Sequence, residues 1–211
     1  MKIILIRHGQ TEWNKEKIFR GRIDVPLDNV GIRQINAIAK RILSSFEINT
    51  IYSSPLIRAL MTAQAIAKPL NLNIKIDDRL IDFNFGEWQG LSLEKVKEKY
   101  SLLYHKWTTE PHLTEIPGGE NLNSVRTRIT KLLNEIVEKE QGDIAIVSHR
   151  IVNKVIICTT LSLDNSYFWK IKQDVAAINV IEYNDGIFII SSLNDTCHLM
   201  TLKQNRETAD F

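Results

Sequence analysis

The chain alternates short apolar segments with longer stretches in which apolar residues recur every three or four positions. The short segments, which are typical of buried strands, are 3–6, 50–53, 73–77 and 143–147. The longer stretches, which have the spacing of core-facing helices, are 30–45, 56–69, 92–106, 121–141 and 151–161. Strands that alternate with helices form parallel sheets covered on both faces. The pattern therefore predicts a three-layer α/β/α fold with a mainly parallel sheet, built as a single domain over 1–211.

The end of the chain has a different pattern, with two apolar runs separated by a tight turn. The runs cover 177–183 and 186–194 and meet at Asn184-Asp185-Gly186. Asp-Gly between apolar runs is a strong hairpin signal. We expect this hairpin to add at an edge of the sheet, where its outer strand offers a place for a homodimer to form. The polar segment 203–211 is expected to fray.

The composition is that of a soluble globular protein, with 44% hydrophobic and 25% charged residues. The net charge is +2 and both signs are interspersed, so the sequence does not indicate a surface for nucleic acid. Cys158 and Cys197 lie far apart without paired histidines, which argues against a zinc site or a disulfide framework. No apolar run approaches the roughly 18 residues of a membrane span, and no signal-peptide pattern is present. We expect a cytoplasmic enzyme that does not bind membranes.

Polar residues directly follow the first and fourth predicted strands. The first strand runs into Arg-His-Gly at 7–9, and the fourth runs into Ser-His at 148–149. Open α/β sheets bind ligands at the carboxyl ends of their strands, so His8 and His149 would both lie at that edge. Each also has a nonfunctional interpretation: His8 could lie in an exposed turn, and His149 could be a structural histidine.

Together these segments resemble the motifs of the histidine phosphatase superfamily, which has the phosphoglycerate mutase-like fold. Residues 7–11 read Arg-His-Gly-Gln-Thr, and residues 53–58 read Ser-Ser-Pro-Leu-Ile-Arg. The resemblance implies that His8 accepts the phosphate and that Arg7, Arg58 and His149 bind it. An ordinary solvated helix residue is the alternative for Arg58. Its place in the first turn of a helix favours anion binding, because the helix amides would face the same anion.

Residues 79–90 resemble the segment that carries the general acid in this family. The match assigns the acid to Asp82, where most members have the longer Glu. Glu87 is a competing carboxylate, but its position between Gly86 and Trp88 places it on the surface side of the loop. The resemblance implies that Asp82 protonates the leaving oxygen and then activates water. No metal or other cofactor is implied, since cationic side chains would neutralise the phosphate.

The leaving group is less clearly indicated than the phosphate site. Family mutases carry a longer insertion after the acid segment, and because only about thirty residues separate Gly90 from Glu120 here, we favour hydrolysis. The sequence also looks like the metal-independent phosphoserine phosphatases at 110–112, 118–120, 168–169 and 196–199. The expected partner is a small acidic phosphate ester, with phosphoserine as the first candidate. Phosphoglycerate mutase, α-ribazole phosphatase and sugar phosphatase activities remain alternatives. A noncatalytic phosphate-binding domain is disfavoured, because such a site needs no nucleophile.

Further substrate contacts are expected from loops around these motifs. Asn14 would supply an amide, and Arg20 and Gly21 are expected to bind substrate because they stand in a polar loop of a length that is often functional. Arg20 and Arg150 could each receive a carboxylate. The resemblance also implies that His198 lies near the substrate amino acid, with a core or hairpin-end histidine as the alternative.

Overall fold

The structure, a computed structural model, describes residues 1–202; the segment 203–211, expected to fray, lies outside the described residues. Its centre is a sheet of six strands in the order β3-β2-β4-β1-β5-β6. The strands are β1 Lys2–Arg7, β2 Ile48–Ser53, β3 Ile74–Ile76, β4 Asp143–Ser148, β5 Ile178–Asn184 and β6 Ile187–Asp195. The first four run parallel, while β5 pairs antiparallel with β1 and β6 with β5. The mainly parallel sheet and the edge hairpin are both confirmed.

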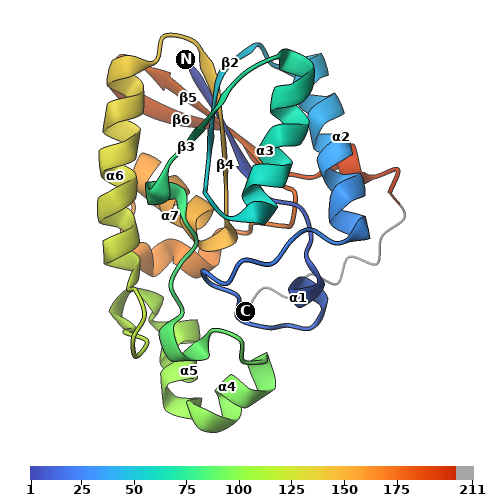
Figure 1. The fold of residues 1–211 in the computed structure, drawn as a ribbon. Helices are drawn as coiled ribbons and strands as arrows, with labels where there is room; N and C mark the ends of the chain where they lie inside the picture. Colours follow the sequence, from blue (N-terminus) through green and yellow to red (C-terminus); the bar gives the residue numbers. More distant parts are fainter. Residues whose placement is uncertain (203–211) are drawn as a thin grey trace.

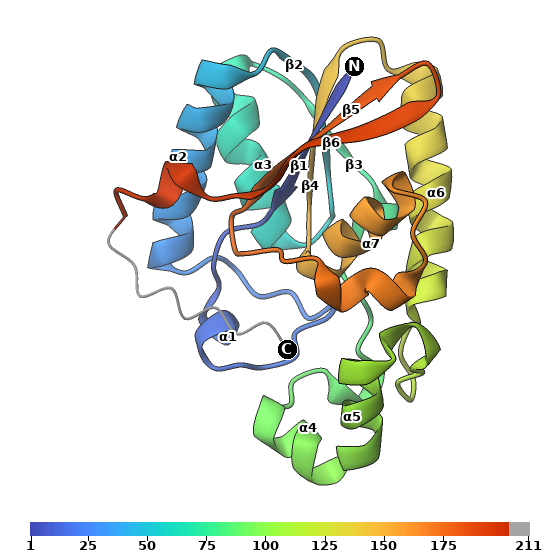
Figure 2. The ribbon, with the colours of Figure 1, turned by 180° about the vertical axis from the view of Figure 1, so that it is seen from behind.

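Helices cover both faces of the sheet (Figures 1 and 2). The helices are α1 Glu12–Lys15, α2 Asn29–Ser45, α3 Ile57–Leu70, α4 Leu93–Lys99, α5 Ser101–Thr109, α6 Leu122–Lys139 and α7 Arg150–Thr160. Because side chains alternate across a strand, Ile4 and Ile6 of β1 pack with α2 and α3. Ile3 and Leu5 pack with α6 and α7 on the opposite face. The predicted three-layer α/β/α architecture is therefore confirmed.

The predicted helix 92–106 is two helices, α4 and α5, divided at Tyr100. The Tyr100 backbone has φ −129° and ψ 40°, which is outside the helical region. Its ring packs against Trp88, with the ring centroids 6.1 Å apart, and its hydroxyl donates to Glu87 at 2.7 Å. Helical periodicity alone does not reveal the break, because the apolar spacing continues through it. The two helices α4 and α5 lie beyond the carboxyl ends of the strands, beside the site described below (Figure 1).

Short 3₁₀ helices connect several of these elements, and two of them carry residues that are discussed below. The segment η4 Asn165–Lys170 follows α7, and η5 Cys197–Leu199 follows β6 and packs on α2. The outer strand β6 exposes Ile187, Ile189 and Leu193 along one face. Within residues 1–202, none of the helices combines the length and apolar character that crossing a membrane would require.

Candidate active site

The two strand-tip histidines lie side by side because β1 and β4 are neighbours in the sheet. The parallel register pairs Arg7 with Ser148, which puts the following residues, His8 and His149, at adjacent strand ends. Their ring centroids are 5.1 Å apart, and both side chains are buried. The order of the strands thus joins two motifs that are far apart in the sequence.

Arg58, which follows the neighbouring strand β2, and Asp82, from the loop after β3, complete this cluster. Arg58 lies in the first turn of α3, directly after β2, and Nη2 donates to Asp82 Oδ2 at 3.0 Å. The same carboxylate oxygen is 3.5 Å from His149 Nδ1. Arg58 is fully buried, and Asp82 is 7% exposed. The side chains that the family motifs single out therefore meet at one point, with Asp82 as the member open to the cleft.

The protonation of His8 is fixed by its surroundings. Its Nδ1 is 2.6 Å from the carbonyl oxygen of Gly9, which can only accept a hydrogen bond, so Nδ1 carries the proton. Burial lowers the pKa of His8 well below its ordinary value, and the positive charge of Arg58 lowers it further. The imidazole is therefore neutral, with Nε2 as its unprotonated nitrogen. This is the state that a histidine nucleophile requires.

His149 is held in the same way, by burial and by a neighbour that the sequence did not indicate. Its Nε2 is 2.7 Å from the Ser54 hydroxyl, which precedes α3 at the tip of β2. Burial is also the main cause that lowers the pKa of His149 well below its ordinary value, and the positive charge of Arg58 is the second. Ser54 lies within the predicted second motif, so its position could have signalled this role.

A loop between α1 and α2 brings a third arginine to the site. Arg20 is half-buried near Arg58 and Arg7, and desolvation followed by these two charges lowers its pKa well below the ordinary value for arginine. Its Nη1 donates to the Thr11 hydroxyl at 2.8 Å. Gly21 has φ +53°, and a Cβ there would lie 2.2 Å from the Gln89 amide oxygen, so a larger residue would not fit. The loop therefore packs closely against the segment that follows Asp82.

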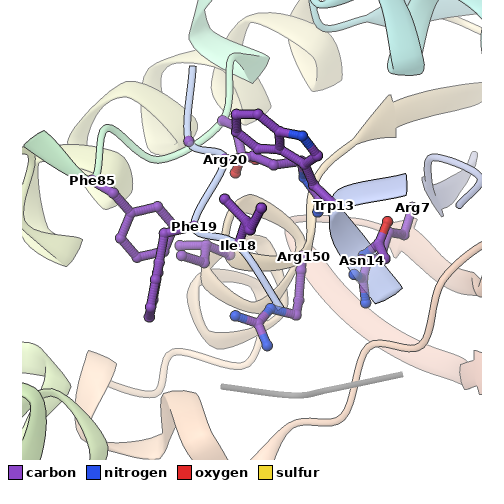
Figure 3. Close-up of a pocket in the computed structure, with 11 residues that line it drawn as sticks. Arg7, Trp13, Asn14, Ile18, Phe19, Arg20, Phe85 and Arg150 are labelled. Carbon is purple, nitrogen blue, oxygen red and sulfur yellow. The ribbon is translucent and has the colours of Figure 1, made fainter. Parts of the chain in front are cut away.

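A cleft opens above these groups (Figure 3). Its lining residues are Arg7, Trp13, Asn14, Ile18, Phe19, Arg20, Gly21, Asp82, Phe85, Arg150 and Ile151. Arg7 and Asn14 lie at one end, and the aromatic Phe19 and Phe85 lie at the other (Figure 3). Six of the sequence-predicted site residues therefore share one cleft, whereas the apolar contribution from Ile18, Phe19 and Ile151 was not expected. The only feature of the sequence that could have indicated these three residues is that each stands within a few residues of a motif.

Arg150 comes from the first residue of α7, immediately after His149. Its guanidinium carbon lies 5.8 Å from the ring centroid of Trp169, on the η4 turn. The indole N–H of Trp169 in turn donates to the Trp107 carbonyl at 2.7 Å. The contact with Trp169 thus holds the Arg150 guanidinium at the cleft.

His8, Arg58 and His149 are buried and do not line the cleft, and His198 is the one predicted substrate-binding residue that does not line it. It lies on η5, which follows the edge strand β6 and packs on α2. There it lines a separate hollow of about 470 Å³ with Arg33, Lys40 and Arg41. The hairpin leads the chain onto α2, and a role of His198 at the substrate stays a prediction. Among residues 1–202, no group of three or more His, Cys, Asp or Glu side chains could hold a metal ion.

Comparison with known proteins agrees with this geometry. Residues 3–196 match the model of the histidine phosphatase superfamily, branch 1. Phosphoserine phosphatase 1 of Hydrogenobacter thermophilus is 37% identical over 200 residues, which cover 94% of each chain. The metal-independent phosphoserine phosphatase of Arabidopsis thaliana is 32% identical over 205 residues, covering 95% of this chain and 84% of that one.

A solved structure agrees as well. The phosphoserine phosphatase of Entamoeba histolytica, as a histidine-to-alanine mutant in complex with phosphoserine, superposes with a TM-score of 0.83 at 31% identity. The match covers 94% of this chain and 99% of that one, and a second structure of that phosphatase holds 3-phosphoglyceric acid. With its two strand-tip histidines and converging arginines, the chain belongs to branch 1 of the histidine phosphatase superfamily and is a phosphatase.

Proposed function

We propose that this phosphatase hydrolyses phosphoserine through a phosphohistidine at His8, without a metal ion. The observation that carries the proposal is the hydrogen bond from His8 Nδ1 to the Gly9 carbonyl, at 2.6 Å. It leaves Nε2 unprotonated in a pocket that Arg7, Arg20 and Arg58 make positive. A nucleophile in the correct tautomer beside three cations is suited to attack on a phosphate monoester.

In the first step, His8 Nε2 bonds to phosphorus while the bond from phosphorus to the ester oxygen breaks. Arg7 and Arg58 present planar guanidinium groups that can each bind two phosphate oxygens. Asp82, entering the step as the carboxylic acid, gives its proton to the leaving serine oxygen. Its position at the cleft wall and next to Arg58 suits a group that meets both substrate and phosphate.

In the second step, the Asp82 carboxylate takes a proton from a water molecule. The water oxygen bonds to phosphorus, the bond from phosphorus to Nε2 breaks, and inorganic phosphate leaves. Asp82 is again the acid and His8 is again neutral, so the cycle closes. Burial helps the second step, because the lowered pKa of His8 makes the imidazole a better leaving group as the neutral base.

Two observations support phosphoserine as the substrate. The phosphoserine phosphatases of Hydrogenobacter thermophilus and Arabidopsis thaliana are 37% and 32% identical to this chain, over 94% and 95% of its length. In addition, Arg150 lies on the cleft wall, in a position from which it could receive the serine carboxylate. The cleft also carries Asn14, whose Oδ1 accepts from Thr11 and whose Nδ2 could donate to the phosphate. Hydrolysis is preferred to mutase chemistry because the segment from 90 to 120 adds only two short helices and a turn.

The test combines a trapping experiment with a substrate panel. The wild-type protein in excess EDTA is mixed with ³²P-labelled phosphoserine and quenched in alkali, and acid-labile, alkali-stable label on the protein is expected. His8→Ala should carry none. The panel contains phosphoserine, 3-phosphoglycerate, α-ribazole phosphate and sugar phosphates, and kcat/KM should be highest for phosphoserine. Label that persists in His8→Ala would exclude the nucleophile, and phosphoglycerate isomerisation without phosphate release would exclude the phosphatase reaction.

A further inference from the structure

The segment 173–177, which carries none of the family motifs, contacts the catalytic strand tip at three places. The Gln173 carbonyl oxygen accepts a hydrogen bond from Arg7 Nη1. The Arg7 backbone N–H donates to the Ala177 carbonyl at 3.0 Å, and the Ala176 N–H donates to the His8 carbonyl at 3.2 Å. Both the guanidinium of Arg7 and the backbone of the nucleophile are therefore placed by this segment.

This segment has a backbone conformation that must be held in place. Ala176 has φ +59°, in the left-handed region that residues with a Cβ rarely adopt, and its side chain is fully buried. Such a conformation persists only where the surroundings determine it. The hydrogen bonds that supply this constraint come from side chains that flank Ala176 in the sequence.

Gln173 and Asn179 form a closed pair of amide side chains, and both are fully buried. Gln173 Nε2 donates to Asn179 Oδ1 at 2.7 Å, and Asn179 Nδ2 donates back to Gln173 Oε1 at 3.0 Å. The orientation of Asn179 is dictated by backbone groups: its Nδ2 also donates to the Leu5 carbonyl, and its Oδ1 also accepts from the Asn194 N–H. Gln173 Nε2 additionally donates to the Lys172 carbonyl. Every polar atom of the two side chains thus has a hydrogen bond.

The placement of this pair links the sheet to the phosphate site. Asn179 lies on β5 opposite Leu5 of β1, between the apolar residues Ile178 and Val180. A buried aliphatic residue would satisfy the packing there, so the amide has to be explained by its hydrogen bonds. Its effect is to hold Gln173 in one position, and through the Gln173 carbonyl to aim the Arg7 guanidinium.

We infer that Gln173 and Asn179 are positioning residues for catalysis, which act by orienting Arg7 toward the phosphate. This inference rests on the proposed function only in assigning phosphate binding to Arg7. Loss of the amide pair would leave Arg7 present but poorly aimed. A displacement of about 1 Å in a catalytic group can cost up to about 100-fold in rate.

The test is a double-mutant cycle between Gln173→Met, which keeps the length of the side chain but loses its polar atoms, and Arg7→Met. The readouts are kcat/KM for 4-nitrophenyl phosphate and the Kd of inorganic phosphate by calorimetry. In the wild-type background, Gln173→Met should lower kcat/KM and raise the Kd of phosphate, each by at least about 10-fold. In the Arg7→Met background it should change each by less than about 2-fold, because the group it orients is gone.

Asn165→Ala is the matched control, since it removes a buried amide on η4 that donates to Asn123. It should lower the urea midpoint without changing phosphate affinity. Equal losses from Gln173→Met in both backgrounds, or full phosphate affinity in the folded variant, would overturn the inference. If Gln173→Met does not fold, Gln173→Glu enters the same cycle, because it keeps the acceptor for Asn179 Nδ2. The Kd of phosphate tests the inference even if the protein hydrolyses no ester. Absence of hydrolysis would contradict only the proposed function.

Discussion

The two buried histidines of the site predict how the stability of the protein depends on pH. His8 is 1% exposed and His149 is fully buried. Burial, followed by the charge of Arg58, lowers the pKa of each well below its ordinary value. The unfolded chain, in which a histidine titrates near about 6.5, therefore binds protons that the folded chain does not. The stabilisation is complete above that pH and is lost as the pH falls toward the lower pKa of the folded state.

The size of the effect follows from the number of protons. Over the range in which the unfolded histidine is protonated and the folded one is neutral, each contributes about 1.4 kcal/mol per pH unit to the slope. For His8 and His149 together, the free energy of unfolding should therefore fall by up to about 2.7 kcal/mol per pH unit below pH 6.5. A fall of this size is large beside the roughly 5–15 kcal/mol that holds a typical domain folded.

Urea unfolding at pH 7.5, 6.5, 6.0 and 5.5 measures this slope. His8→Gln and His149→Gln should each reduce it by up to about 1.4 kcal/mol per pH unit at the acid end of this range, whatever they do to the stability at pH 7.5. His105→Gln, which replaces an exposed histidine on α5, is the matched control for the substitution itself. The reasoning is refuted if the slope of His8→Gln or His149→Gln equals that of this control.

Three further predictions concern packing, proton transfer and thiol reactivity. Gly31→Ala gains about 1 kcal/mol of helix propensity. The new Cβ would lie 2.1 Å from the Gln10 carbonyl, however, and such overpacking costs about 1–3 kcal/mol, so the urea midpoint should fall. Asp82→Asn should slow hydrolysis of phosphoserine far more than that of 4-nitrophenyl phosphate, whose leaving group needs no proton; equal losses would remove the general-acid role. Burial raises the pKa of the Cys158 thiol to about 11, so Ellman's reagent should label one thiol, the exposed Cys197, in the folded protein and two in urea.

Controls for the first two of these substitutions are available in the chain. Gly142→Ala would bring its Cβ to 2.2 Å from the Asn49 side-chain oxygen, which accepts from the Asp143 N–H. Moving this side chain costs one hydrogen bond and no backbone shift, so the loss of stability should be smaller than that of Gly31→Ala. Asp78→Asn alters an exposed carboxylate four residues from the proposed acid, and its ratio of the two activities should match the wild type. Rapid labelling of both thiols in the folded protein would contradict the burial of Cys158.

Much of the site could be predicted because its groups stand at the ends of regular elements. His8 and His149 follow apolar strands, and Arg58 lies in the first turn of a helix, so the carboxyl edge of a parallel sheet was enough to bring them together. The division of α4 from α5 was not predictable, because the contact of Tyr100 with Trp88 overrides an unbroken helical spacing. The position of His198 could not be predicted for a related reason: where a chain goes after an edge strand depends on which helix it meets.

The sequence by itself determined the strands, the helices and the order of the motifs, since hydrophobic periodicity and turn residues act over a few positions. The tertiary structure alone decided which distant groups support the chemistry. Arg7 meets the Gln173 carbonyl 166 positions away, and His149 meets the Ser54 hydroxyl 95 positions away. The Gln173 carbonyl stands out in no local pattern, and Ser54 lies in a motif that does not name its partner. Each becomes a neighbour of the site only when the strand order and the left-handed turn at Ala176 bring it there.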